Sequence, residues 1–478
     1  MAFARVLRDK KNLKLFFSII LPLILLILPA SAFGIEGLTV IQQRVIALFA
    51  LAALFWVLEP IPIFATSILL ITLELVMISD SSFLPFRGEA TAEFGNAMSY
   101  HEIMDTFASP VILLFLGGFF LAAAATKYRL DQNIAGVLLR YFGEKPQWVL
   151  LGLMAITAVF SMFMSNTATT AMMLSILIPV LNVFPPNDRA RTAFVLGIPI
   201  AANLGGIGTP IGTPANAIAL KFLAGSHITF GMWMSFGVPI VLLMMGFAWL
   251  LLVMFYRSST RTIHLNIPVS FVKTPKAVIV YATFLLTVFL WLTDFLHGMN
   301  AYVVAMIPVS IFLATGIINK EDLKVISWDV LWLVSGGIAL GLALTQTGLA
   351  QAVITSIRLD TMSPLTIFAA ACLIGLVLAN FMSHTATANL ILPLLAGLGT
   401  SAASLASVGG TELIIIGTTI STSLAMSLPI STPPNALAHS TGLVQTKDLA
   451  KVGVLIGIVG FALVGLTMFV LYSTHFIS

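Results

Sequence analysis

The sequence predicts an all-α polytopic membrane protein, on the strength of its composition and its long apolar runs. Of the 478 residues, 59% are apolar and only 9% are charged, whereas about 25% of the residues of soluble globular domains are charged. A surface with so few charges must face lipid over most of its area. Because one helical crossing takes about 20 apolar residues, the chain has room for ten or more crossings and little else.

Eleven apolar runs are long enough to cross the bilayer as helices. They cover 15–34, 41–58, 62–78, 109–126, 190–222, 232–256, 277–296, 300–318, 327–346, 408–440 and 452–473. Two further apolar regions, 148–184 and 364–400, are interrupted by polar clusters. We interpret these two as re-entrant hairpins, which turn near the membrane centre and leave on the side where they entered. The first run follows basic residues, as in a signal peptide, but it reaches Gly34, and we expect a retained helix.

The positive charges predict how the chain is oriented. With a cytoplasmic N-terminus, eleven crossings and two hairpins, 19 of the 23 Lys and Arg residues fall on the cytoplasmic side. The four that fall outside are Arg44, Arg87, Lys221 and Arg358. Because cytoplasmic loops are enriched in Lys and Arg, we expect a multi-pass protein of the inner (plasma) membrane with its C-terminus outside. The net charge of +4 is modest, and the sequence lacks the basic surface that a nucleic-acid partner would require.

Polar motifs recur at a fixed distance along the chain. Gly117-Gly118 is matched by Gly336-Gly337, Ser165–Thr169 by Ser383–Thr387, and Gly212–Ala217 by Ser431–Ala436, at offsets of 218 or 219 residues. In the topology above, 109–126 and 327–346 cross in opposite directions, so the repeat is inverted. We expect N-terminal transmembrane helices over 1–58, a first repeat over 59–257 and a second, inverted repeat over 277–474. Inverted repeats with interrupted helices are typical of secondary transporters, whose sites lie at the repeat interface.

The hairpin tips carry polar side chains between apolar flanks. In the first tip, Met164–Thr170, five of the seven side chains are polar. Backbone that is not helical at this depth must line a cavity or be buried in protein. A second helix that begins at the tip presents free amide groups and the positive end of its dipole, which together bind anions. A single cluster of this kind would more simply hold helices together, but two at matched positions favour a binding site.

A second pair of motifs breaks two of the expected crossings. The segment Gly205–Pro214 contains four glycines and two prolines and cannot form a continuous helix. Its counterpart, Ser431–Asn435, breaks the run 408–440 in the same way. Unwound carbonyl groups hold Na⁺ in transporters of this kind, and the half-helix that follows holds an anion. A simple proline kink is the alternative.

None of the four motifs contains Lys or Arg. A guanidinium would be the strongest way to hold a carboxylate, so we expect neutral donors, helix ends and bound cations to balance the charge of an anion. His384 stands where the first motif has Asn166. It would bind substrate or take a proton, or it would act as a neutral donor in place of the amide, and the sequence leaves both roles open.

The paired Ser-Xaa-Thr tips and Thr-Pro-Xaa-Asn breaks resemble the divalent anion/sodium symporter family, over nearly the whole chain. The family includes bacterial dicarboxylate transporters and mammalian di- and tricarboxylate and sulfate carriers. The resemblance implies a homodimer in which a scaffold of early helices supports a transport domain that contains the hairpins and moves as an elevator. It also implies Na⁺ as the coupling ion.

The family's sites are carried over residue by residue. The implied substrate contacts are Asn166, Thr167, Thr213, His384, Thr385, Thr432 and Pro433. One sodium site would use Ser161, Ser165, Asn166 and Gly212. The second would use Ala379, Ser383, His384 and Ser431, but Ala379 lacks a hydroxyl and His384 stands where the symporters have Asn, which puts this second site in doubt.

We therefore expect a secondary transporter that imports C4-dicarboxylates such as succinate, malate or fumarate together with Na⁺. The alternatives are a Na⁺-independent carboxylate exchanger and a carrier of sulfate or tricarboxylates. An anion channel on the same fold is a further class. We do not expect an enzyme, because the sequence contains neither an HExxH-type metal cluster nor a recognisable Ser–His–Asp arrangement.

Overall fold

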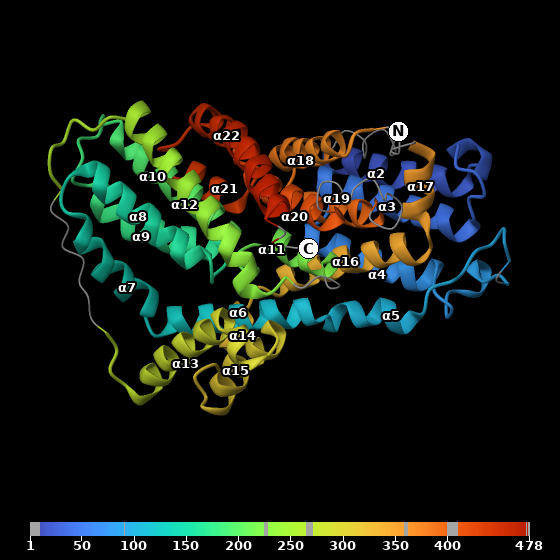
Figure 1. Cartoon of the computed structure of the whole chain (residues 1–478), viewed down its shortest axis with the longest axis horizontal. Coiled ribbons are helices and arrows are strands. Elements are labelled where there is room, and N and C mark those ends of the chain that lie inside the picture. The colour runs from blue at the N-terminus through green and yellow to red at the C-terminus, as the bar shows by residue number, and fades with distance from the viewer. Residues whose placement is uncertain are drawn as a thin grey trace.

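The computed structural model describes residues 10–89, 91–223, 228–263, 271–357, 362–398, 410–474 and 476, and these residues form a bundle of α-helices (Figure 1). Within these ranges the only β-pairing is an isolated bridge between Ser79 and Met98. Eight described helices are long and apolar enough to span a membrane, and shorter apolar helices accompany them. The all-α polytopic fold is therefore confirmed, whereas the number of crossings stays a prediction.

The helices follow one another in two comparable series. The first contains α2 (Lys10–Ile27), α3 (Val40–Leu58), α4 (Ile63–Met77), α5 (Tyr100–Asp105), α6 (Pro110–Lys127), α7 (Leu130–Leu139), α8 (Pro146–Ser161), α9 (Asn166–Leu181), α10 (Ala190–Ile207), α11 (Pro214–Phe222) and α12 (Phe230–Phe255). The second contains α13 (Pro275–Leu292), α14 (Asp294–His297), α15 (Ala301–Ala314), α16 (Trp328–Gln346), α17 (Leu349–Ile357), α18 (Pro364–Phe381), α19 (His384–Leu398), α20 (Gly410–Ser423), α21 (Pro433–Ser440) and α22 (Thr446–Ser473).

Several expected crossings have different bounds in the structure. The run 15–34 is not one helix, because α2 ends at Ile27 and Pro29, which has no amide hydrogen, leads into a 3₁₀ turn. The run 300–318 stops at Ala314, shortly before Gly316 adopts a left-handed φ of 61°. The crossing expected at 109–126 is longer, since a nearly continuous helical run extends from Tyr100 to Lys127.

Some expectations fall outside the described residues. They concern the N-terminal segment 1–9, which includes Arg5 and Arg8, the end of the second hairpin at 399–400, the start of a crossing at 408–409, and Arg358.

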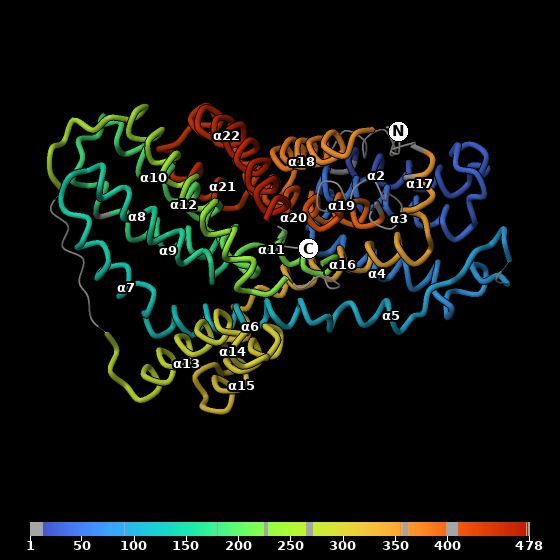
Figure 2. The backbone as a smooth tube through the Cα atoms, in the orientation of Figure 1, coloured from blue at the N-terminus to red at the C-terminus, as the bar shows by residue number. Residues whose placement is uncertain are grey.

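Both polar tips lie between two helices, as the sequence predicts. The chain turns back between α8 and α9 over residues 162–165, and between α18 and α19 at Met382 and Ser383 (Figures 1 and 2). In each tip a serine starts the second helix. Ser165 Oγ accepts a hydrogen bond from the backbone N–H of Ala168, and Ser383 Oγ accepts one from Ala386, both at 3.1 Å. A serine cap of this type favours helix initiation at that residue.

The two Pro-containing breaks are held open by matched asparagines. The side chain of Asn216 donates to the carbonyl oxygens of Gly206 at 3.0 Å and Thr209 at 2.8 Å. The side chain of Asn435 donates to the carbonyl oxygens of Met426 and Leu428, both at 3.0 Å. These bonds satisfy carbonyl groups that the end of α10 or α20 leaves without a helical partner. Each expected crossing, 190–222 and 408–440, is therefore two helices joined by a fixed irregular segment.

Helices from the two series interlock. α4 packs against α16, and α15 packs against α6. Matched glycines permit both contacts: a Cβ atom at Gly117 would lie 2.4 Å from the carbonyl oxygen of Ala305, and one at Gly336 would lie 2.3 Å from Cβ of Ser67. Small residues of this kind allow close approach of membrane helices.

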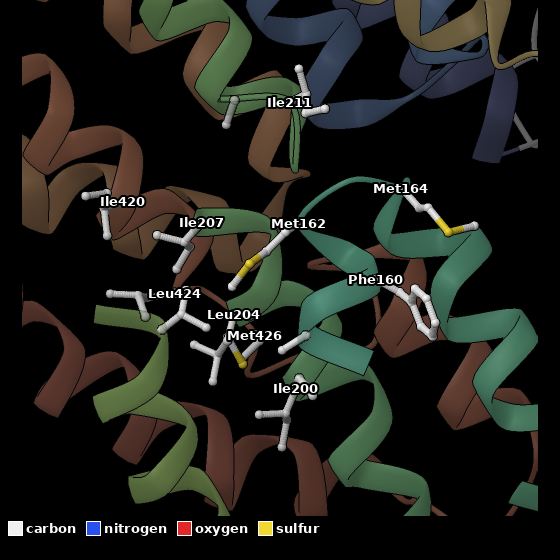
Figure 3. Packing of buried hydrophobic residues seen from close by; sticks show 14 of the residues in the cluster. Phe160, Met162, Met164, Ile200, Leu204, Ile207, Ile211, Ile420, Leu424 and Met426 are labelled. Carbon is white, nitrogen blue, oxygen red and sulfur yellow. The ribbon is translucent and has the colours of Figure 1, made fainter. Parts of the chain in front are cut away.

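Behind the breaks, one apolar cluster joins α10 to the segment that follows α20. Leu204 and Ile207 belong to the same buried cluster as Leu424 and Met426, and they gather together in Figure 3. Side chains that are packed at this density tolerate little movement, so the two breaks are held against each other.

Candidate functional site

A cavity of about 260 Å³ lies where the second helix of each hairpin and the helix after each break begin. Its polar lining comes from Ser165, Asn166 and Thr167 at the start of α9, from Ser383, His384 and Thr385 at the start of α19, from Gly212, Thr213 and Pro214 at α11, and from Ser431–Pro434 at α21. The first N–H groups of a helix have no partner within the helix, and the macrodipole is positive at that end. All four helices therefore direct positive potential into one cavity.

The rest of the cavity wall comes from helices outside the hairpins. Ile63 and Phe64 at the start of α4, Phe115 and Phe119 of α6, and Val330 and Leu333 of α16 make this side mostly apolar. Ser327 and Asp329 lie at the start of α16. Of the described residues in the lining, only Asp329 carries a charged side chain, and it is exposed. Among the described residues, neither Lys nor Arg lines this cavity.

The cavity brings together every residue that was predicted to contact substrate. Asn166, Thr167, Thr213, His384, Thr385, Thr432 and Pro433 all line it. Of the predicted sodium ligands, Ser165, Asn166, Gly212, Ser383, His384 and Ser431 line it as well. Ser161 and Ala379 are fully buried and do not line the cavity. The residues are thus assembled as expected, while their roles stay proposals.

The side-chain amide of Asn166 faces a group of oxygen atoms. One of its terminal atoms lies 2.6 Å from Ser161 Oγ, 3.0 Å from the carbonyl oxygen of Gly212 and 3.3 Å from that of Ala202. Ser161 Oγ donates to the same Ala202 carbonyl at 2.8 Å. If the NH₂ group of Asn166 faces these oxygens, it donates to them. If the amide oxygen faces them, four oxygens converge, and that arrangement needs a cation.

The matched group in the second half is built differently. A ring nitrogen of His384, Nε2, lies 2.5 Å from the carbonyl oxygen of Ala425 and donates to it. Ser431 Oγ donates to the carbonyl oxygen of Asn380 at 2.9 Å and accepts from the N–H of Leu428 at 3.2 Å. Ala379 stands in place of Ser161 and has no polar side-chain atom. The polar atoms here satisfy one another.

Three polar residues of the cavity lining, Asn203, Ser327 and Asp329, were missed by the sequence reasoning. Asn203 lies in the last third of α10 and is 1% exposed, and its side-chain nitrogen donates to Thr432 Oγ1 at 3.1 Å. Its signal was a lone amide inside an apolar run, which is rare within membrane helices. Asp329 gave no usable signal, because an acidic residue in the first turn of a helix is common for dipole reasons alone.

The family model described as CitMHS, citrate transporter, matches residues 53–416, which is well over half of the chain. The chain belongs to the CitMHS citrate transporter family. The resemblance to divalent anion/sodium symporters is thereby confirmed.

Relatives of this CitMHS chain are named for different substrates. The sodium-dependent dicarboxylate transporter SdcS of Staphylococcus saprophyticus is 29% identical over 492 residues, covering 95% of this chain and 90% of that protein. The inorganic phosphate transporter PHO87 of Saccharomyces cerevisiae is 28% identical over 407 residues, covering 84% of this chain and 43% of that protein. The chain spans about half the length of the yeast relatives that it matches.

One solved structure shares the fold of this CitMHS chain. It is the YdaH transporter of Alcanivorax borkumensis, with a TM-score of 0.56, 12% identity, and coverage of 90% of this chain and 98% of that one. At this identity the likeness concerns the fold alone.

Proposed function

We propose that the protein imports small divalent anions, most of all C4-dicarboxylates such as succinate, malate and fumarate, together with Na⁺. The observation that carries this proposal is the meeting of four helix N-termini in one cavity that neither Lys nor Arg lines among the described residues. Helix ends and hydroxyl donors hold an anion without a fixed positive side chain, so the anion can leave again. Release is required of a transporter as much as binding.

The two tips provide one set of donors for each end of a dicarboxylate. Asn166 and Thr167 offer their first-turn N–H groups and side chains from α9. From α19, His384 offers its backbone N–H group, and Thr385 offers its backbone N–H group and its hydroxyl. Thr213 and Thr432 add hydroxyl groups at the starts of α11 and α21. A molecule with a carboxylate at both ends can engage both tips at once. Sulfate or phosphate, with one charged centre, would engage them less fully.

The residues of the first half fit a sodium ion. Ser161 Oγ, the amide oxygen of Asn166, and the carbonyl oxygens of Ala202 and Gly212 approach one another closely, as the distances above show. Neutral oxygen ligands from unwound helix are typical of Na⁺ sites in transporters. A bound Na⁺ supplies positive charge beside the anion. The amide oxygen of Asn166 then faces the cation, and its NH₂ group is left to face the anion.

The residues of the second half do not fit a second sodium ion as well. Its Ala425 carbonyl is taken by His384 and its Ser431 hydroxyl by Asn380. We propose that the imidazole takes the place of a second cation by donating to the Ala425 carbonyl oxygen. This arrangement favours a runner-up, which is Na⁺-independent exchange of carboxylates. Carriage of sulfate or tricarboxylates is the other alternative, since the family is described as citrate transporters.

We also propose how the protein is organised around the site. The interlocked helices α4, α6, α15 and α16 form a scaffold, and the two hairpins with α10–α11 and α20–α21 form a transport domain that moves as an elevator. The domain boundaries remain 1–58, 59–257 and 277–474, with the two repeats inverted in a plasma membrane, the N-terminus inside and the C-terminus outside. The homodimer rests on the family resemblance.

Uptake of labelled succinate by proteoliposomes of the purified protein tests this function. We expect an inward Na⁺ gradient to drive accumulation, with citrate, sulfate and phosphate as weaker competitors. Uptake that ignores Na⁺ but requires internal succinate would establish the exchanger. Flux without saturation or counterflow would contradict both and indicate a channel.

A further inference from the structure

Among the described residues of the cavity, Asn203 is the side chain of the first half that hydrogen-bonds to a motif of the second. We propose that Asn203 is a positioning residue that holds the hydroxyl of Thr432 as a hydrogen-bond donor toward the bound anion. The inference rests on the proposed function and adds a residue to it. Asn203 comes from α10, whereas Thr432 is the residue that starts α21.

The hydrogen bonds that Thr432 accepts leave its hydroxyl free only to donate. Its Oγ1 accepts from the side-chain nitrogen of Asn203 at 3.1 Å and from the backbone N–H of Asn435 at 3.2 Å. A threonine hydroxyl has one hydrogen to donate and two lone pairs to accept with. With both lone pairs occupied, only the O–H remains, and Thr432 lines the cavity. An anion offers acceptors and no donors, so a donor is what the site needs.

The orientation of the Asn203 amide follows from a chain of bonds. Asn435 must direct its NH₂ group to the carbonyl oxygens of Met426 and Leu428, because carbonyl groups only accept. Its amide oxygen is therefore turned to Asn203, whose NH₂ donates to it at 3.2 Å. The opposite orientation of Asn203 would set two amide oxygens against each other. The backbone of the break thus determines which way the Thr432 hydroxyl points.

This arrangement leaves the oxygen of Asn203 buried without a hydrogen-bond partner. A buried acceptor without a hydrogen-bond partner destabilises the folded protein. The cost fits a side chain that serves the site through its nitrogen, because a residue with only a structural role could be apolar here.

The first half of the site has no equivalent. At the offset of 219 residues, Asn203 corresponds to Thr422, whose hydroxyl donates to the carbonyl oxygen of Thr419 in its own helix at 2.7 Å. The oxygen of Asn216, the counterpart of Asn435, has no partner, and Thr213 makes no side-chain capping bond. The two threonines that face the anion are therefore unequal, and Thr432 is the one that is held as a donor.

The test measures KM and Vmax for labelled succinate exchange in proteoliposomes for the wild type, Asn203→Ala, Thr432→Ala and the double variant. We expect Asn203→Ala to raise KM roughly tenfold with little change in Vmax, as for the loss of one oriented bond to a charged group. In the Thr432→Ala background, Asn203→Ala should change KM no further. Thr422→Val, at the matched position, is the control and should keep the wild-type KM.

Asn203→Asp keeps the shape of the side chain but replaces the donor with acceptors, so it should raise KM at least as much. If Asn203→Ala does not fold, Asn203→Asp provides the same test. An unchanged KM in both variants, or equal effects of Asn203→Ala with and without Thr432, would overturn the inference while leaving the proposed function intact. A wild type that neither takes up nor exchanges succinate, citrate, sulfate or phosphate would overturn both.

Discussion

The imidazole Nε2 of His384 lies 2.5 Å from the carbonyl oxygen of Ala425, where the first half of the site has the amide of Asn166 beside Ser161 and Gly212. The two halves thus place different chemistry at matched positions. The amide offers an oxygen or an NH₂ group, and the ring offers a donor to a carbonyl that would otherwise be available to a cation. This difference decides how strongly transport should depend on Na⁺.

His384→Asn should strengthen the Na⁺ dependence of succinate uptake, because it restores an amide oxygen and frees the Ala425 carbonyl. The measurement is the initial rate of succinate uptake as a function of external Na⁺ concentration. His384→Gln is the control, because it carries the same amide on a longer side chain. We expect a steeper Na⁺ dependence in the Asn variant. An unchanged response to Na⁺ would count against the idea that the ring replaces a cation.

Asn166→Ala should abolish succinate uptake and leave the protein folded. The change removes the one side chain that joins the anion cavity to the Ser161–Gly212 oxygen group, whereas Ser165 still caps α9. Asn133→Ala, on α7 and outside the cavity, is the control and should retain activity. The fold of the variant is checked by its monodispersity in detergent solution and by its thermal unfolding. Full activity of Asn166→Ala would remove the site assignment.

Asp329→Asn should lower the KM for succinate. Asp329 is an exposed negative charge in the cavity lining, so it repels a divalent anion across a solvated distance. A screened repulsion of this kind is worth about twofold to threefold in affinity, and the gain should fade at high salt. Glu321→Gln, which removes an exposed charge that pairs with Lys324 instead, should leave KM unchanged. A higher KM in Asp329→Asn would contradict this prediction and indicate that the carboxylate assists succinate binding.

Asp188→Asn should destabilise the protein at neutral pH but not in acid. Burial raises the pKa of Asp188, but hydrogen bonds from Ser259, Ala190 and Ser258 outweigh it and hold the pKa below its usual value of 3.8. A carboxyl group whose pKa is lower in the folded than in the unfolded protein stabilises the fold at any pH above its unfolded-state pKa. This stabilisation is lost as the pH falls through the pKa of the folded state. Hydrogen bonds to a charged group are worth about 1.5–3 kcal/mol.

Thermal unfolding across the pH range measures that effect. The difference between the wild type and Asp188→Asn should be full at pH 7 and should close below about pH 3.8. Asp105→Asn, which replaces an exposed carboxylate, should show no such difference. A gap that persists unchanged in acid would contradict the assignment.

Most residues of this site could be predicted from the sequence, because its polar motifs occur twice. Polar residues at 165–167 and 383–385 stand out between apolar flanks, and unpaired backbone in lipid is costly enough to make such clusters informative. The structure brings these tips and both breaks to one cavity, as their matched positions imply. By contrast, the bond from Asn203 to Thr432 joins residues 229 apart in sequence. No local pattern records such a pairing, since it depends on how α10 packs against α21.

Helix ends were predicted less well, and for local reasons. The first crossing ends early at Pro29, and α15 ends near Gly316. In both places an apolar run continues past the end of the helix, because hydropathy responds to side chains whereas Pro and Gly act through the backbone.

Substrate protection of single cysteines tests the central claim most directly. Cys372 is the only cysteine of the chain, so Cys372→Ser provides a background in which Thr167→Cys and Pro433→Cys are labelled one at a time. Both positions are exposed and line the cavity, one from each half. With Na⁺ present, succinate should slow alkylation at both, and should leave Ser440→Cys, at the far end of α21, unaffected. Equal labelling rates with and without succinate at either cavity position would contradict a single anion held between the two halves.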